Sequence, residues 1–108
     1  METTQQTAAR HQREAHQQDC IELYVANYKE LYDLTFKAGL LIQRNQAWHP
    51  DSTKGRHYIR RAVNKAIRAA RDRGEDIFQP HVTDFVRGAA IDSILTSVKA
   101  EAKLGNYA

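Results

Sequence analysis

Residues 56–73 read RHYIRRAVNKAIRAARDR, and this stretch decides the fold class. At about 100° per residue, its apolar side chains fall on one half of a helix. Gly74 follows, and glycine is favoured just after a helix end because it accepts a left-handed backbone. The stretch therefore predicts an amphipathic α-helix with an inward apolar face. Its outward face carries six cations and one amide: Arg56, Arg60, Arg61, Asn64, Lys65, Arg68 and Arg71.

The positive charge of the chain is concentrated in and next to this stretch. Residues 54–73 carry eight cations and one anion, whereas residues 1–53 and 74–108 each have a net charge of −2. The net charge of +3 for the whole chain hides this asymmetry. Because charge distribution is more informative than net charge, the asymmetry marks the helix as the candidate functional surface.

Two further stretches have helical periodicity, at residues 19–43 and 81–103. The apolar arc of residues 19–43 is unusually wide, and so wide an arc needs more than one packing partner. We expect a second copy of the chain to be one partner. The aromatic ladder at i+4 spacing is equally well explained as core with its hydroxyls at the rim. The residues of the expected dimer or partner interface are Tyr24, Tyr28, Tyr32, Phe36, Leu23, Leu34 and Leu41.

Residues 81–103 have a single apolar stripe, and Thr83 competes with Pro80 to start this helix. The predicted stripe is Val82, Phe85, Val86, Ala89, Ala90, Ile94, Leu95, Val98 and Ala102. Residues 44–55 and 75–80 read as connections, and no stretch alternates as a strand does. Residues 1–18 are polar and glutamine-rich. The sequence thus predicts an all-α fold: a small three-helix domain over 19–108, a homodimer, and a polar N-terminal extension over 1–18.

Composition narrows the class of protein. The 108 residues allow one domain, and 42% hydrophobic with 27% charged residues is typical of a globular chain. The single Cys20 excludes an internal disulfide, and no secretory signal is visible, so we expect a cytoplasmic protein. His16 and Cys20 lie one helical turn apart, but a structural zinc site needs four ligands. We therefore predict no metal and no cofactor.

The basic face predicts a non-enzymatic binding protein. Arginine suits bidentate contact with phosphate, so the first hypothesis is a DNA- or RNA-binding protein that contacts the phosphate backbone, with Asn64 and an arginine reading bases. Carboxylates need the same donors. The alternative is therefore a bacterial or phage- or plasmid-type inhibitor or accessory protein that docks its basic helix on an acidic partner.

Residues 44–49, RNQAWH, carry a third hypothesis. The arginine–polar–x–x–x–histidine pattern resembles the catalytic motif of the HEPN superfamily, all-helical ribonucleases and toxins that often act as dimers. The resemblance implies RNA cleavage through attack of a 2′-hydroxyl. Arg44 would then stabilise the charge on the reacting phosphate, and His49 would transfer a proton.

Overall fold

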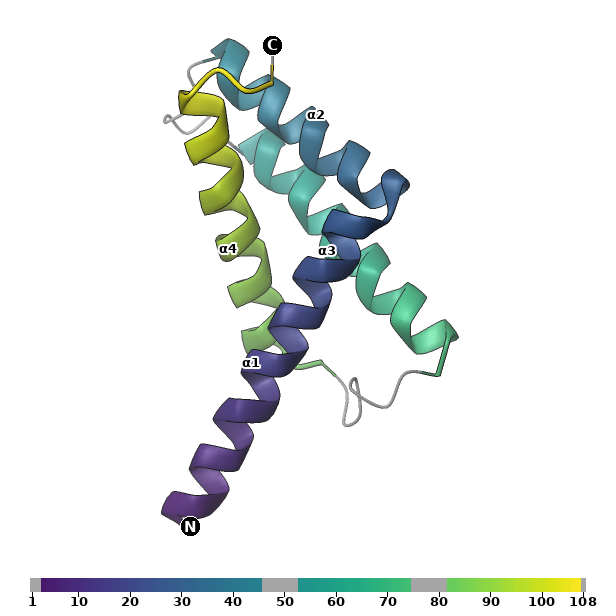
Figure 1. Cartoon of the computed structure of the whole chain (residues 1–108), viewed down its shortest axis with the longest axis vertical. Helices are drawn as coiled ribbons and strands as arrows, with labels where there is room; N and C mark the ends of the chain where they lie inside the picture. Colours follow the sequence, from purple (N-terminus) through teal and green to yellow (C-terminus); the bar gives the residue numbers. More distant parts are fainter. Residues whose placement is uncertain (1–2, 46–52, 75–81, 108) are drawn as a thin grey trace.

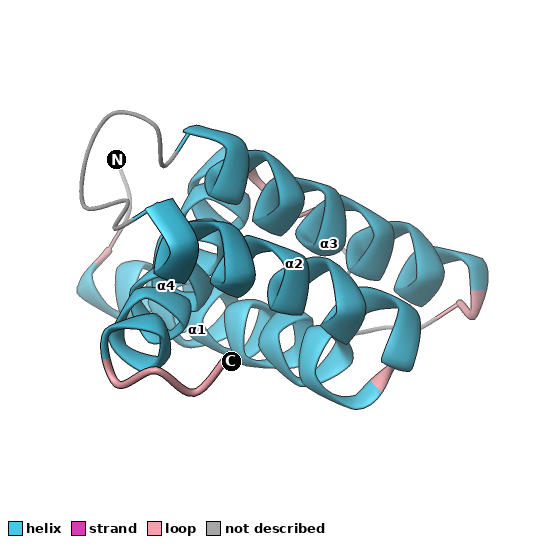
Figure 2. Ribbon diagram, turned by 90° about the horizontal axis from the view of Figure 1, so that it is seen from above, coloured by secondary structure: helices cyan, strands magenta, loops and turns pink. Residues whose placement is uncertain are grey.

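The computed structural model describes residues 3–45, 53–74 and 82–107. Within these ranges the chain forms four helices and no strand: α1 (Thr4–Asn27), α2 (Lys29–Asn45), α3 (Thr53–Asp72) and α4 (Asp84–Lys103). Figure 1 shows α3 beside α2, with α4 and α1 crossing on the other side of the bundle. The view from above in Figure 2 confirms that α2 and α3 are neighbours. The all-α prediction is confirmed, whereas the three-helix count is not.

The additional helix arises because the predicted helix over 19–43 is broken at Tyr28. This residue has an extended backbone, with φ −99° and ψ 121°, and its N–H still donates to the Tyr24 carbonyl. Val25 is buried before the break and Leu34 after it. On one continuous helix at about 100° per residue, Val25 and Leu34 are nine positions apart and would point in opposite directions. The break lets the buried residues before and after it pack into the same core. One chain therefore supplies the packing partners that the wide apolar arc needs.

The polar N-terminal stretch is helical from Thr4 onward. Helix α1 starts at Thr4 behind an N-cap in which the Thr3 hydroxyl accepts from the Gln6 N–H and the Gln6 side chain accepts from the Thr3 N–H. Its first turns extend beyond the other helices, and residues 8–13 are exposed (Figure 1). Gln17, however, is only 2% exposed. The predicted boundary at residue 18 therefore lies inside a helix that continues into the core.

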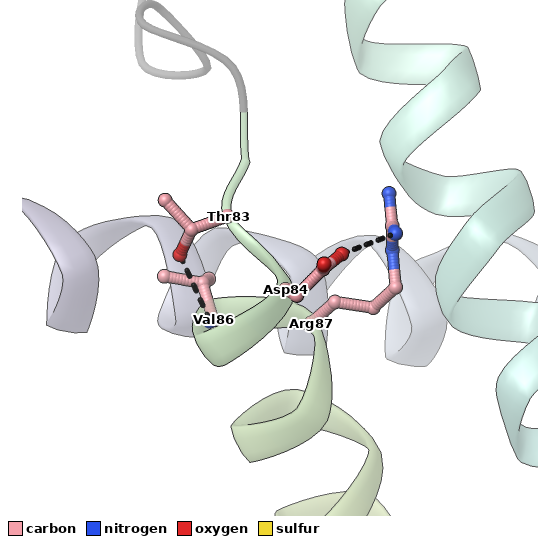
Figure 3. A network of polar contacts seen from close by, with 4 residues as sticks. All are labelled: Thr83, Asp84, Val86 and Arg87. Carbon is pink, nitrogen blue, oxygen red and sulfur yellow. Dashed lines mark hydrogen bonds and ion pairs between the residues drawn. The ribbon is translucent and has the colours of Figure 1, made fainter.

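Helix α4 begins at Asp84 behind the Thr83 cap, and not at residue 81 as predicted, so Thr83 rather than Pro80 sets its start. The Thr83 hydroxyl accepts from the Val86 N–H at 3.2 Å, and Asp84 pairs with Arg87 within the first turn, also at 3.2 Å (Figure 3). Val86 and Val98 are buried as expected. The prediction for Phe85 is wrong, because its side chain is 71% exposed. One residue step along the helix rotates residue 85 by about 100° from Val86 and places it on the outer side of the buried stripe.

The core lies between all four helices and is aliphatic. Its largest fully buried side chains are Ile21, Ile42, Ile59, Val63 and Val86. Helix α3 contributes a row of alanines that allows its neighbours to approach closely. None of the described helices has the length and apolarity that crossing a membrane requires.

Candidate functional site

The exposed face of α3 carries four arginines and an asparagine. We use the term basic ridge for the exposed residues Arg60, Arg61, Asn64, Arg68 and Arg71. The opposite face of α3 is buried, including Ile59, Val63 and Ile67. The helix therefore presents its arginines to solvent because its apolar half is held in the core. At about 1.5 Å per residue, the ridge from Arg60 to Arg71 is about 16 Å long.

The two remaining predicted binding residues are half-buried at the edges of the ridge and are paired within the chain. Arg56 Nη1 lies 2.8 Å from an Asp92 carboxylate oxygen on α4. On the other edge, Lys65 Nζ donates to Glu30 on α2 at 2.9 Å. This hydrogen bond, and then the lysine charge, lowers the pKa of the Glu30 carboxyl. The ridge is thus flanked by one ion pair to each neighbouring helix.

The four arginines between these edges have no such partner. No carboxylate in the described parts of the chain lies within ion-pair distance of Arg60, Arg61, Arg68 or Arg71. Four guanidinium groups of like charge on one helix face repel one another, and a polyanion in contact with them relieves that repulsion. The arrangement is therefore suited to an anionic partner with several regularly spaced charges.

Arg73 is a functional candidate that the sequence reasoning left out of the binding set. It lies just beyond α3 and off the ridge, with its guanidinium carbon 4.7 Å from the centroid of the Tyr28 ring. Arg73 Nη1 also donates to the Tyr28 hydroxyl. The two residues are separated by 45 positions, so no local pattern in the sequence points to this contact.

The predicted aromatic ladder is divided by the break at Tyr28. Tyr24 and Tyr28 stack, with ring centroids 5.2 Å apart and planes 11° apart, whereas Tyr32 and Phe36 lie on α2. Phe36 then makes an edge contact with Tyr107. Tyr24, Tyr28 and Phe36 are half-buried, so the ladder contributes to packing at two separate places.

The other residues of the expected interface also differ in exposure. Leu34 lies in the core, Leu41 is half-buried, and Leu23 is 59% exposed. Because the helix break gives the wide apolar arc its packing partners within one chain, that arc no longer requires a second copy of the chain. The homodimer stays a prediction, with Leu23 and the 49%-exposed Tyr32 as its exposed apolar residues.

Two clefts of about 350 Å³ have opposite charge. The first lies between the start of α2 and the end of α3, and its lining includes the cations Lys29, Arg68 and Arg73. The second lies between α1, α2 and α4, and its charged lining residues are Glu22 and Glu101. The positive cleft adjoins the basic ridge because Arg68 belongs to both. Arg68 therefore joins the positive cleft to the basic ridge.

The remaining predicted sites have less support. His16 Nε2 lies 3.7 Å from Cys20 Sγ, but no group of three potential metal ligands occurs among the described residues. Arg44 is exposed in the last turn of α2. His49, its partner in the HEPN-like pattern, lies outside the described residues.

Comparison with protein-family models, with curated proteins and with solved structures finds no match to this chain, so the candidate site is interpreted from its own geometry.

Proposed function

We propose that this protein binds nucleic acid through the phosphate backbone, with the basic ridge of α3 as the contact surface. The observation that carries the proposal is a difference in ion pairing between the cations at the edges of the basic ridge and the arginines at its centre. Arg56 and Lys65 are paired with carboxylates of the same chain, whereas the four ridge arginines have no ion-pair partner among the described residues. The central guanidinium groups are therefore available for bidentate contact with phosphate oxygens.

The dimensions of the ridge support the proposal. Its length of about 16 Å corresponds to about five nucleotides of one strand, at about 3.4 Å each. Arginine forks donate two parallel hydrogen bonds to phosphate oxygens. Neutralisation of phosphates releases condensed counterions, so the affinity of such a complex falls steeply with salt. Asn64 lies within the same face and supplies an amide that can donate to or accept from a base edge.

The test is a salt titration with a matched control. Binding of a fluorescent oligonucleotide is followed by anisotropy from about 50 to 200 mM salt, and four phosphate contacts predict a slope of log K against log [salt] of about −3 to −4. The charge-reversed variant R60E/R68E should lose binding at the lowest salt. The variant R13E/K103E makes the same change in net charge at exposed positions on α1 and α4. It should bind nearly as the parent does.

Two results would overturn the proposal. One is no binding of nucleic acid by the parent protein at the lowest salt. The other is an equal loss of affinity in both variants, because that would show a response to net charge rather than to the ridge.

The second candidate is an acidic protein partner, and the two edge ion pairs favour it. In these pairs, cations of this helix contact carboxylate oxygens at 2.8 and 2.9 Å. A polyglutamate chain of matched length, used as a competitor in the same titration, separates the two functions. We expect it to displace nucleic acid only in large excess. Equal competition per unit of charge would instead favour the acidic partner.

A further inference from the structure

The positive cleft beside the basic ridge has both apolar and cationic walls. It lies where the first turn of α2 meets the last turns of α3, and Leu31 and Ala69 contribute apolar surface. The lining holds four cationic and two acidic side chains. One of the acids, Glu30, is already paired with Lys65. The cleft therefore keeps a positive balance around a partly apolar interior, which suits a ligand that is flat, apolar on its faces and attached to a negative charge.

Tyr28 and Arg73, which line this cleft, belong to a stack of two rings and one guanidinium group. Tyr24 and Tyr28 are nearly parallel, and the Arg73 guanidinium lies over Tyr28 while donating to its hydroxyl. The side chain of Arg73 is therefore held in place although the residue is exposed. Guanidinium planes and tyrosine rings are the surfaces on which proteins stack unpaired nucleobases.

The cleft has the size of one nucleobase and lies next to a residue of the basic ridge. At about 30 Å³ per water molecule, about 350 Å³ equals about a dozen waters, comparable with the heavy atoms of a single purine. Arg68 lies on the ridge and also lines the cleft. A phosphate bound by Arg68 would thus place the base of an adjacent nucleotide at the mouth of the cleft.

We propose that the cleft formed by Tyr28, Leu31, Ala69 and Arg73 receives an unpaired base of a single-stranded nucleic acid whose phosphates lie along the basic ridge. This inference rests on the proposed function and makes it narrower. In a duplex the bases are paired and stacked inside, and extrusion of one base costs free energy before it can enter a pocket. The protein should therefore prefer a single strand to a duplex.

The experiment compares three polyanions that share a phosphate backbone: a single-stranded oligonucleotide, the same strand annealed to its complement, and a strand of equal length with abasic residues. We expect the intact single strand to bind about tenfold more tightly than the abasic strand, the effect of about one stacked base. The duplex should bind more weakly than the intact single strand. Equal affinity for the intact and the abasic strands would overturn the cleft proposal and leave backbone binding in place. No binding of any of the three would overturn the proposed function as well.

The variant Arg73→Lys tests the stacking role of this residue. Lysine keeps the positive charge but has no planar group to stack, so this variant should lose most of the tenfold preference and keep its affinity for the abasic strand. Arg73 is exposed and lies outside α3, so its substitution removes no buried side chain from the core. Tyr28→Leu is a second variant with the same expected loss. An unchanged preference in Arg73→Lys would overturn the role of this residue and with it the cleft proposal.

Discussion

The phenol ring of Tyr107 lies against the backbone of Gly39, so closely that a methyl group on residue 39 would come within 2.5 Å of the tyrosine Cζ. The Tyr107 N–H donates to Gln43 at 3.0 Å, and its ring contacts the edge of Phe36. The segment after α4 is thereby fastened onto α2. The glycine in the middle of α2 is required by this contact rather than by backbone conformation, because helical residues accept alanine readily.

Gly39→Ala should therefore destabilise the protein in a way that depends on Tyr107. We expect a loss of about 1 kcal/mol, since overpacking by one methyl group outweighs the helix propensity gained. In a Tyr107→Ala background the same substitution should become stabilising by up to about 1 kcal/mol. Urea denaturation of the four proteins of this cycle measures both values. A loss of the same size in both backgrounds would contradict the contact.

Tyr107 should also make stability sensitive to alkaline pH. Its pKa is raised, mainly by burial and further by Tyr32 and Glu101. The unfolded chain releases this proton first, so the contribution is complete below the unfolded pKa of about 10 and is lost as pH rises through the higher folded pKa. Tyr107→Phe should show a shallower decline in urea midpoint above about pH 10. An identical decline in both proteins would contradict the assignment.

The ion pair between Lys65 and Glu30 at the edge of the ridge should be detectable through the lowered pKa of Glu30. Lys65 lowers the pKa of Glu30. The contribution of the pair to folding stability is therefore complete above the unfolded pKa of this carboxyl, and it is lost as pH falls through the lower folded pKa. Lys65→Met should move the Glu30 midpoint upward in an NMR titration of the side-chain carboxyl. Arg56→Met is the control, since Arg56 pairs with Asp92 on α4 and should leave Glu30 unchanged.

Removal of the α4 cap should lower the free energy of unfolding more than removal of a similar hydroxyl within the helix. Thr83→Ala leaves the Val86 N–H without its acceptor, at a cost of about 1 kcal/mol (Figure 3). Thr83→Ser should retain most of the stability because serine caps equally well. Thr96→Ala is the control, since Thr96 only donates to the Asp92 carbonyl within α4. Equal losses at 83 and 96 would contradict the capping role.

Bound RNA should remain intact. The basic ridge supplies cations for phosphate contact, and the predicted function is binding without chemistry. Incubation of labelled RNA with the parent protein, followed by denaturing electrophoresis, should show no cleavage beyond that with His49→Ala. Cleavage that disappears in His49→Ala while RNA binding persists would instead favour the HEPN-like ribonuclease.

Much of α3 could be predicted from the sequence, because amphipathicity is a local property. The alternation of Ile59, Val63 and Ile67 with the ridge arginines repeats every 3.6 residues, and it places one set inward and the other outward whatever the neighbours are. Gly74, with φ 69°, likewise follows the helix end as its residue type predicts.

The break at Tyr28 was not predictable in the same way. Tyr24, Tyr28 and Tyr32 continue the i+4 spacing without interruption, so the local pattern favours one helix. The two buried stripes can face one core only if the helix changes direction, and that requirement arises from packing against α3 and α4.

The sequence by itself determined that the chain is helical and that α3 has one buried and one basic face, because these features depend on residues within a few turns of each other. It placed the start of this helix at residue 56, whereas α3 begins at Thr53, inside the connection predicted over 44–55. Tertiary structure decided which cations remain available. Arg56 and Lys65 meet carboxylates 36 and 35 positions away, and Arg73 meets Tyr28. Partners so distant in the chain are brought together only by the packing of the helices, which no local periodicity encodes.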